Sequence, residues 1–446
     1  MKQNLSIPDV LRCATQSRFN QLVLEHLSAA QPLAAGPRTM PNEAKAFAST
    51  QAAWRFYHNP RYSMPIIARP LLEAAREAVH EECQEFVLAV HDWSHIHLDH
   101  ENKKDRIELG NGHDLGYELQ ACLLVGDRNG KPLAPVYLGV EAADGVHSTK
   151  HGTPKPPLSQ LDSLKPVMMD VQQMELGKLV IHLIDAEADS VFHYRSWSEE
   201  KDFFYLVRAD DRLAMHDDQE KKFSEIHQQL LGQNAFSFSR EVSYHDKPAV
   251  QFVAETTIIL TRPAHQNRKG KPRKTIPGPP ITLRLIISEV RDAQGKVLAV
   301  WYLLTNAPLW VTAATIALWY YWRWRIESYF KLLKSAGQQL EHWLQETAEA
   351  FARRLVVASM ACVLVWRLAR SESPHAAKLR KVLVRLSGRQ MRRGKEFTEP
   401  ALLAGLWVLL SMLSLLENHD PEELRQWLYD SLRSGRGPPH DASKKV

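Results

Sequence analysis

The amino-acid sequence predicts an α/β protein whose α/β fold is interrupted by a β-rich insertion and flanked by helical N- and C-terminal regions. Two apolar runs of strand length, Phe86–Val90 and Leu179–Ile184, are each followed closely by an aspartate. A strand-rich segment, 203–304, then leads to a C-terminal third that has a helical pattern after Pro308. These three observations predict the fold class.

Composition places the chain among globular proteins of several domains. Of its 446 residues, 44% are hydrophobic and 24% are charged, which excludes disordered and collagen-like classes. The four cysteines form no C-x-x-C pair, which argues against a zinc ribbon or a disulfide framework. The sequence opens on no signal-peptide core, and no uncharged run reaches the roughly 20 residues of a membrane span. We therefore expect a cytoplasmic protein that makes no membrane contact.

The first two predicted regions are 1–78, which is helical, and 79–202, which is α/β. After Asn20, apolar residues at helical spacing are interrupted by prolines, so we expect short helices joined by turns. In the second region Phe86–Val90 is predicted to be a buried strand that ends at His91 and Asp92. Further strands are predicted at Tyr117–Leu124, Val136–Val140 and Leu179–Ile184.

The remaining regions are the β-rich insertion 203–304, a second catalytic part 305–370 and a helical C-terminal region 371–446. Polar and Pro/Gly turns separate the strands of the insertion. Apolar helices beyond Leu355 are candidates for a dimer contact. Strands are expected at Phe203–Val207, Ala235–Tyr244, Val250–Leu260, Ile281–Val290 and Leu298–Leu304.

Positive charge is concentrated in two segments. The total is only +5, from 56 Lys and Arg against 51 Asp and Glu, and so neither demands nor excludes a polyanionic partner. Eight basic residues and no acid lie between 378 and 395. A solvated loop would explain one such segment, but two favour binding to a phosphate backbone. The other segment contains Arg262, Arg268, Lys269, Lys271, Arg273 and Lys274.

The segment 319–334 is predicted to be one amphipathic helix that ends near Gly337. At about 100° per residue, one carboxylate, three cations and two aromatic rings share one face. An ordinary surface helix explains a Glu–Lys pair four residues apart, but explains less well why two aromatic rings would be exposed beside it. The shared face carries Tyr320, Arg323, Trp324, Glu327, Lys331 and Lys334, and the buried face Trp322, Ile326, Tyr329 and Leu333.

Three carboxylates are predicted to converge. Asp92 and Asp185 each follow an apolar strand, at the sheet edge where ligand sites gather, and Glu327 would join them from the helix. Three like charges need neutralisation, and oxygen ligands suit Mg²⁺ or Mn²⁺. Two such ions can activate a water or a 3′-hydroxyl for attack on a phosphodiester.

The spacing Tyr320-x2-Arg323-x3-Glu327-x6-Lys334 resembles the Y-R-E-K signature of the DDE transposases of bacterial insertion sequences, in the insertion-sequence-4 family. The segments 90–94 and 185–189 resemble the motifs of that family's first and second aspartates. Segment 301–308 resembles the strand before the signature helix, and 53–60 a block of the N-terminal DNA-binding domain. The resemblance covers roughly residues 20–370.

The resemblance implies an RNase H-like catalytic domain interrupted by a β-rich insertion between the second aspartate and the glutamate. It implies a Mg²⁺-dependent endonuclease and strand transferase that cuts double-stranded DNA at the element's ends and joins the 3′-hydroxyl to target DNA, as a dimer when two ends are paired. Metal ligands would be Asp92, Asp185 and Glu327. DNA-binding residues would be Tyr320, Arg323, Lys331 and Lys334 at phosphates, Trp301 and Trp324 at a flipped base, and Arg268, Lys269, Lys271, Arg273 and Lys274 in the insertion.

The sequence departs from the family pattern at two places. No Leu-Gly-Asp block is recognisable before Asn20, and the arginine that commonly follows the second aspartate is Ala186. The first departure motivates one alternative, a transposase-derived DNA-binding regulator without catalysis. A second alternative is a metallohydrolase that uses the four histidines and two aspartates of segment 91–100, which would favour zinc, copper or nickel.

Overall fold

We analysed a computed structural model, which describes residues 16–24, 51–98, 103–110, 113–245, 247–268, 271–417 and 419–433. By its contacts the chain divides into two compact units. One comprises 60–341 and 345–370, and the other comprises 1–59, 342–344 and 371–446. The predicted α/β class is confirmed, because the larger unit is built on a mixed sheet of 13 strands, counted over the described residues.

Five strands form the first half of this sheet, in the order β4-β3-β1-β6-β7. Neighbours are antiparallel among β1, β3 and β4, whereas β1, β6 and β7 run parallel. The short strands β2 (Ile107–Glu108) and β5 (Gly145–Ser148) pair with β3 and β4. The five strands are β1 (Phe86–His97), β3 (Leu115–Gly126), β4 (Pro132–Ala142), β6 (Leu179–Ile184) and β7 (Phe204–Ala209).

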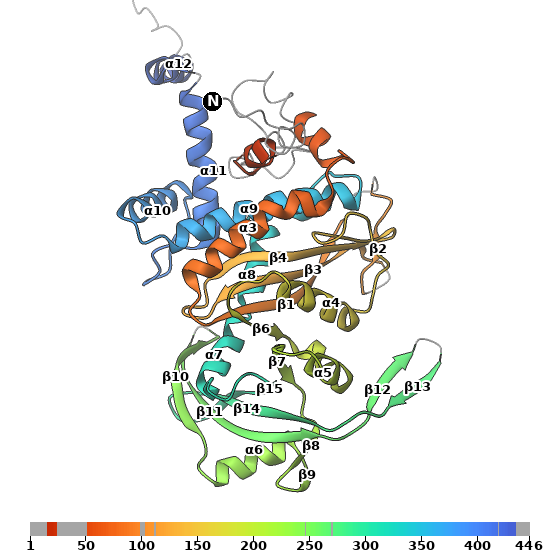
Figure 1. Ribbon diagram of the computed structural model, residues 1–446. Helices are drawn as coiled ribbons and strands as arrows, with labels where there is room; N and C mark the ends of the chain where they lie inside the picture. The colour runs from red at the N-terminus through yellow and green to blue at the C-terminus, as the bar shows by residue number, and fades with distance from the viewer. Residues whose placement is uncertain are drawn as a thin grey trace, which may run out of the picture. The chain divides into compact units, whose positions relative to one another are not determined.

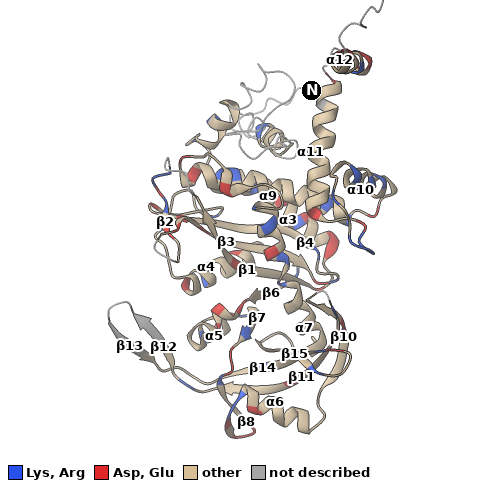
Figure 2. Cartoon of the chain, turned by 180° about the vertical axis from the view of Figure 1, so that it is seen from behind, with Lys and Arg blue, Asp and Glu red and all other residues tan. Residues whose placement is uncertain are grey.

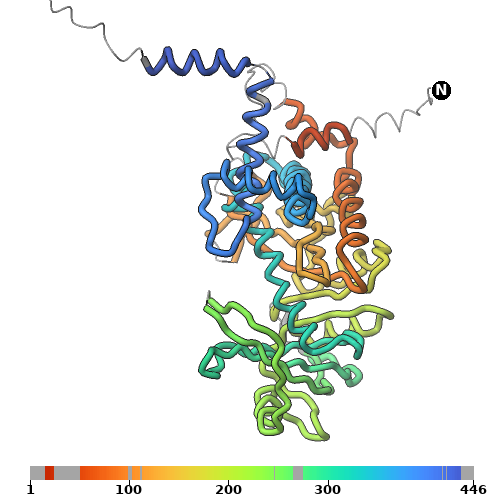
Figure 3. The backbone as a smooth tube through the Cα atoms, turned by 90° about the vertical axis from the view of Figure 1, so that its left-hand side faces the viewer, coloured from red at the N-terminus to blue at the C-terminus, as the bar shows by residue number. Residues whose placement is uncertain are grey.

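The insertion continues the same sheet through one seam, where β15 (Val297–Thr305) pairs antiparallel with β7. β15 is followed by β14 (Ile281–Arg291) and β11 (Lys247–Leu260), and β10 (Ser237–Tyr244) pairs with β11. Because β7 also pairs with β6, we group β7 with the first five strands, although it lies within the predicted insertion 203–304. Figure 3 shows the green insertion strands grouped at one end of this unit, apart from the orange and yellow strands.

Smaller elements complete the insertion. β8 (Leu213–His216) pairs with β9 (Gln219–Lys222), and α6 (Phe223–Gly232) follows them. β12 (Ala264–Arg268) and β13 (Lys271–Ile276) form a separate two-stranded hairpin. This hairpin contains most of the predicted basic segment, but Lys269 and the side chains of 265–274 lie outside the described residues.

Helices of the larger unit pack on the sheet through apolar faces. α3 (Met64–Glu82) and α9 (Ala348–Arg370) pack on β4, and α4 (Gln160–Gln172) packs on β6. The α3 helix begins with Ser63 as its N-cap and has a proline in its first turn, where the missing N–H costs nothing. A hydrophobic core runs without interruption from α4 and α5 (Val191–Ser198) across β7 to β11 and β14.

The smaller unit is helical. Its described helices are 16–24, 51–57, α10 (Pro374–Leu386), α11 (Glu399–Leu416) and α12 (Pro421–Arg433). Figure 2 shows Lys and Arg on α10, within the basic segment 378–395. One of these residues, Arg380, is buried and donates a hydrogen bond to the carbonyl oxygen of Ser371 at 2.6 Å, so it is engaged within the fold. Of the described helices, none has both the length and the apolar character to cross a membrane.

Two expected features differ from the structure. Strand β1 continues through Asp92 to His97, because antiparallel pairing with β3 persists after burial weakens at Asp92. Helix α9 was a candidate for the dimer contact, but it is buried inside the larger unit, with Leu355, Val356 and Val357 fully covered. Exposed apolar side chains lie instead on α11 and α12, where Met412, Leu413 and Leu432 are 47%, 49% and 73% exposed.

Candidate active site

The predicted signature helix is two helices, α7 (Ala313–Trp322) and α8 (Arg325–Leu333), which meet at Arg323. Thr312 caps α7 by accepting a hydrogen bond from the Thr315 N–H at 3.2 Å. At the other end the Arg323 N–H bonds to the Tyr320 carbonyl, three residues back, which tightens and ends the helix. A wheel drawn for one continuous helix is therefore wrong beyond this junction.

Packing fixes the junction in place. The Trp322 ring lies against Gly130, at a turn between β3 and β4 where a Cβ would come within 2.4 Å of the ring. Arg325 Nε donates to the Gly130 carbonyl oxygen at 2.7 Å. The predicted buried face is confirmed, since Ile326, Tyr329 and Leu333 are fully covered and Trp322 is 8% exposed.

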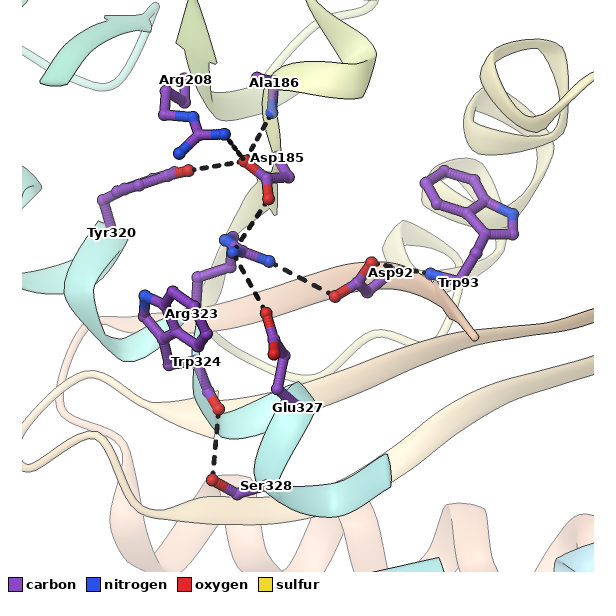
Figure 4. Close-up of polar contacts among 10 residues, drawn as sticks. All are labelled: Asp92, Trp93, Asp185, Ala186, Arg208, Tyr320, Arg323, Trp324, Glu327 and Ser328. Atoms are coloured by element: carbon purple, nitrogen blue, oxygen red, sulfur yellow. Dashed lines mark hydrogen bonds and ion pairs between the residues drawn. The ribbon is translucent and has the colours of Figure 1, made fainter. Parts of the chain in front are cut away.

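The three predicted carboxylates converge on the guanidinium of Arg323. Its Nη1 lies 3.4 Å from Asp92 Oδ2, and its Nη2 lies 3.0 Å from Asp185 Oδ2 and 3.6 Å from Glu327 Oε1. Figure 4 shows the guanidinium between the carboxylates, which come from β1, the end of β6 and α8. The Arg323 side chain is 3% exposed, whereas those of Asp92, Asp185 and Glu327 are 20%, 29% and 34% exposed.

Asp185 has the largest number of partners in this cluster. Its Oδ1 accepts from the Ala186 N–H at 2.7 Å and from the Tyr320 hydroxyl at 3.0 Å, and Arg208 Nη2 lies 3.2 Å away. Tyr320 is therefore 4% exposed, not on an open polar face as the helical wheel predicted. Arg208, on β7, was missed by the sequence reasoning, because nothing local to that strand marks its contact with Asp185.

The remaining predicted residues lie outside this contact network. Lys334 Nζ donates to the His95 carbonyl oxygen and lies 3.5 Å from Glu341 Oε1, so it pairs within the chain. Lys331 is exposed on α8. Trp301 is half-buried on β15 opposite Ser288.

Trp324 is 54% exposed, and the Arg323 guanidinium lies 5.4 Å from the centre of its ring. A π-face of this kind, open to solvent and next to the carboxylates, can stack on a planar partner. The aromatic residue expected in contact with a base is thus accessible at the junction of α7 and α8.

Burial controls protonation in the cluster. Desolvation raises the pKa of Asp92 from its ordinary 3.8 to about 6, against the opposing effect of Arg323, and the charges of Glu327 and Asp185 raise it further. Burial also disfavours the charged form of Arg323, but Tyr320 and the three carboxylates together raise its pKa, so it stays protonated. Three carboxylates against Arg323 and Arg208 leave one net negative charge.

The donor chemistry suits a divalent cation, because the three groups are carboxylates, which Mg²⁺ and Mn²⁺ prefer. Within the described residues, however, no three His, Cys, Asp or Glu side chains are grouped closely enough to hold one ion. Arg323 provides the physical reason, since its guanidinium lies in the space between the carboxylates. A bound cation would share this space with Arg323 or displace it.

The histidines of segment 91–100 do not form a metal centre among the described residues. His91 Nε2 lies 2.9 Å from His182 Nδ1, and burial lowers the pKa of His91 to about 3, so this pair is neutral. His95 and His97 are described, whereas Asp99 and His100 lie outside the described residues.

An Asp92→Asn variant is expected to be more stable than the wild type at pH 8, by up to about 3 kcal/mol, with no difference at pH 3.5. The folded pKa of Asp92 lies above its unfolded value, so its stabilising effect is complete below 3.8 and is lost as the pH rises through about 6. Urea denaturation at both pH values measures this. Lower stability of the variant at pH 8 would contradict it.

Comparisons with known proteins leave the family unassigned. The sequence matches no known protein family and no curated protein. Among solved structures, a cryo-EM structure titled as the piggyBac transposase synaptic complex with hairpin DNA is similar, at 10% identity and a TM-score of 0.32. The match covers 81% of this chain and 59% of that one, so this chain spans less than two thirds of its length. At these values the likeness assigns neither a family nor an activity.

Proposed function

We propose that this protein is a cut-and-paste DNA transposase of the DDE type, which cleaves DNA at the ends of an insertion sequence and joins the 3′-hydroxyl to target DNA. The observation that carries the proposal is the convergence of Asp92, Asp185 and Glu327 on Arg323. These residues are 93 and 142 positions apart along the chain, and the fold brings them together at the positions of the Y-R-E-K signature. The insertion lies between Asp185 and Glu327, as an RNase H-like domain of this kind requires.

In this proposal Asp92, Asp185 and Glu327 hold two Mg²⁺ or Mn²⁺ ions. When bound, such ions lower the pKa of a water or a 3′-hydroxyl and stabilise the leaving oxygen of a phosphodiester. The residues of the chain then orient the DNA. Tyr320 and Arg323 hold phosphates beside the carboxylates, and Lys331 and Lys334 extend the positive charge along α8.

The direct test begins with the DNA that flanks the gene. We expect short inverted repeats bracketed by a direct duplication, and a plasmid that carries this DNA should be nicked at the repeat ends by the purified protein with Mg²⁺. Flanking DNA without repeats, or a protein that binds the repeats and never cuts them, would instead favour the DNA-binding regulator.

Trp324→Ala is expected to weaken binding to DNA with an unpaired base at the cleavage end by about 1–3 kcal/mol, the usual contribution of one stacked base. The fold should be unchanged, because the Trp324 side chain is 54% exposed. Fluorescence anisotropy with paired and unpaired ends measures the difference. An equal loss on fully paired DNA would contradict stacking on a free base.

The basic hairpin of β12 and β13 is proposed to contact the DNA backbone. Replacing Arg268, Lys269, Lys271, Arg273 and Lys274 with glutamine should weaken binding to all DNA sequences equally. It should also reduce the slope of log K against log salt by about 0.9 for each phosphate that these side chains neutralise in the wild type. Binding titrations between 50 and 200 mM salt test this, and an unchanged slope would contradict it.

We also propose that the active form is a dimer, since two ends must be brought together. The exposed apolar side chains of α11 and α12 are the proposed contact, among them Met412, Leu428 and Leu432. Light scattering on the complex with DNA ends should give two protomers for two ends. One protomer for two ends would contradict this.

A further inference from the structure

A pocket lies between β3, β4 and α4, on the face of β1 opposite to the carboxylate cluster. It encloses ≈ 670 Å³, part of which is open to solvent, within the range of about 300–1,000 Å³ found for small-molecule sites. Because side chains alternate along a strand, Asp92 and Trp93 point to opposite faces, and Figure 4 shows the Trp93 indole directed away from the cluster. Trp93 and Tyr137 form its aromatic lining.

Two carboxylates lie on one side of this pocket. Glu118 and Glu141 stand directly opposite each other on β3 and β4, where like charges destabilise a sheet. Burial raises the pKa of Glu141, and the charge of Glu118 raises it further. Glu118 already accepts a hydrogen bond from Gln160 Nε2 at 2.8 Å, and His95 Nε2 lies 3.4 Å away. The lining nevertheless holds more acceptor oxygens than donors on this side, which favours a ligand with a donor group.

A buried amide on the same wall requires an acceptor. Gln120 is 8% exposed, and its Nε2 is fully covered without a hydrogen-bond partner among the described residues. A buried donor left without a partner costs about 1–3 kcal/mol, so such a group needs an explanation. Gln120 lines the pocket, and a ligand acceptor next to it would satisfy the amide.

The aromatic part of the wall depends on a glycine. Gly139 stands opposite Gln120 in the β3–β4 register, and a Cβ at this position would lie 2.8 Å from the Tyr137 hydroxyl. The absence of a side chain there lets the Tyr137 ring lie along β4 beside the amide. The pocket therefore combines aromatic rings, carboxylate acceptors and one amide donor.

We propose that this pocket binds a nucleobase that carries an exocyclic amino group next to a ring acceptor, such as cytosine or adenine. The amino group donates to the carboxylates of Glu118 and Glu141, the ring acceptor receives the Gln120 Nε2–H, and Trp93 and Tyr137 contact the base. A simple ammonium ion would satisfy the carboxylates but leave Gln120 unpaired. Uracil and thymine carry no amino group. The inference rests on the proposed function only in that DNA would supply the base.

Isothermal titration calorimetry on the full chain with cytidine tests this, with uridine as the matched control. We expect saturable cytidine binding that is at least about tenfold tighter than uridine binding, because a hydrogen bond to a charged acceptor is worth about 1.5–3 kcal/mol. Glu141→Gln and Gln120→Leu should each weaken cytidine binding about tenfold. If Gln120→Leu does not fold, Glu141→Gln decides the test. Equal affinity for uridine, or no effect of Glu141→Gln, would overturn the proposal.

Two further arms separate the remaining sources of ligand. Oligo-dC that displaces cytidine, while oligo-dT does not, identifies DNA as the source, and failure of both to compete identifies free nucleosides. Spermidine that displaces cytidine at lower concentration than cytidine itself would show an ammonium site and overturn the proposal. Glu327→Gln should bind cytidine normally while losing cleavage. Failure of nucleobase binding and failure of the transposase function are therefore read separately.

Discussion

Glu327→Gln should abolish Mg²⁺-dependent nicking of the element's ends, by a factor on the order of a thousand or more, while DNA affinity stays within about twofold. The amide keeps the size of the side chain but removes the negative charge that a divalent cation requires. Loss of several kcal/mol of metal-dependent stabilisation corresponds to a rate loss of this size. Single-turnover cleavage and an anisotropy titration on the same DNA measure the two quantities.

Glu341→Gln is the matched control, because Glu341 contacts Lys334 and the His97 N–H and lies outside the carboxylate cluster. This variant should retain most of the cleavage rate. If Glu327→Gln still nicks cognate ends in Mg²⁺, the assignment of Glu327, and the DDE mechanism with it, is wrong.

Arg323→Ala should lower the free energy of unfolding by about 3 kcal/mol at pH 8. This is the lower end of the range for a buried ion pair that loses one partner, because the carboxylates left behind are partly exposed. Without Arg323 the pKa of Asp92 rises above its present value of about 6, since the one nearby charge that lowers it most is gone. Urea denaturation at pH 8 and pH 4 measures the effect.

The sign of the pH dependence follows from this rise. A carboxyl whose folded pKa lies above its unfolded value contributes stability at low pH and loses it as the pH increases. The deficit of the variant should therefore be larger at pH 8 than at pH 4. Arg208→Ala, which removes a half-exposed partner of Asp185 alone, should cost no more than about 1 kcal/mol. Equal deficits for the two variants would show that Arg323 has no central role.

The sequence was informative where burial and strand pattern coincide. Strands β3, β11, β14 and β15 lie where alternating or apolar runs predicted them, with ends shifted by a few residues. The short strands β2, β5, β8 and β9 were not predicted, because two to four residues carry no usable periodicity and depend on a partner strand for their hydrogen bonds. Polar side chains predominate in β9, which the sequence alone assigns to a turn.

Convergence of the carboxylates could be predicted, but the manner could not. Spacing along one helix placed Tyr320 on an open face, whereas the break at Arg323 turns it toward Asp185 and buries it. No helix-breaking glycine or proline marks this break, because the ion pairs of Arg323 with Asp92 and Asp185 are tertiary contacts. The contribution of Arg208 depends on which strand lies next to β6, and this information is absent from local sequence.

The seam between β7 and β15 has a mechanical consequence. Arg208 pairs with Leu303 and Leu304 with Val207, and the Asn306 side chain extends the seam by accepting from the Tyr205 N–H at 2.9 Å and donating to the Phe203 carbonyl at 2.8 Å. Seven residues after Asn306, α7 begins and carries Tyr320 to Asp185. Any force that DNA applies to the insertion strands is therefore transmitted through backbone hydrogen bonds to both sides of Asp185. The insertion cannot swing as a tethered module, and its removal would leave the hydrogen-bonding edge of β7 exposed.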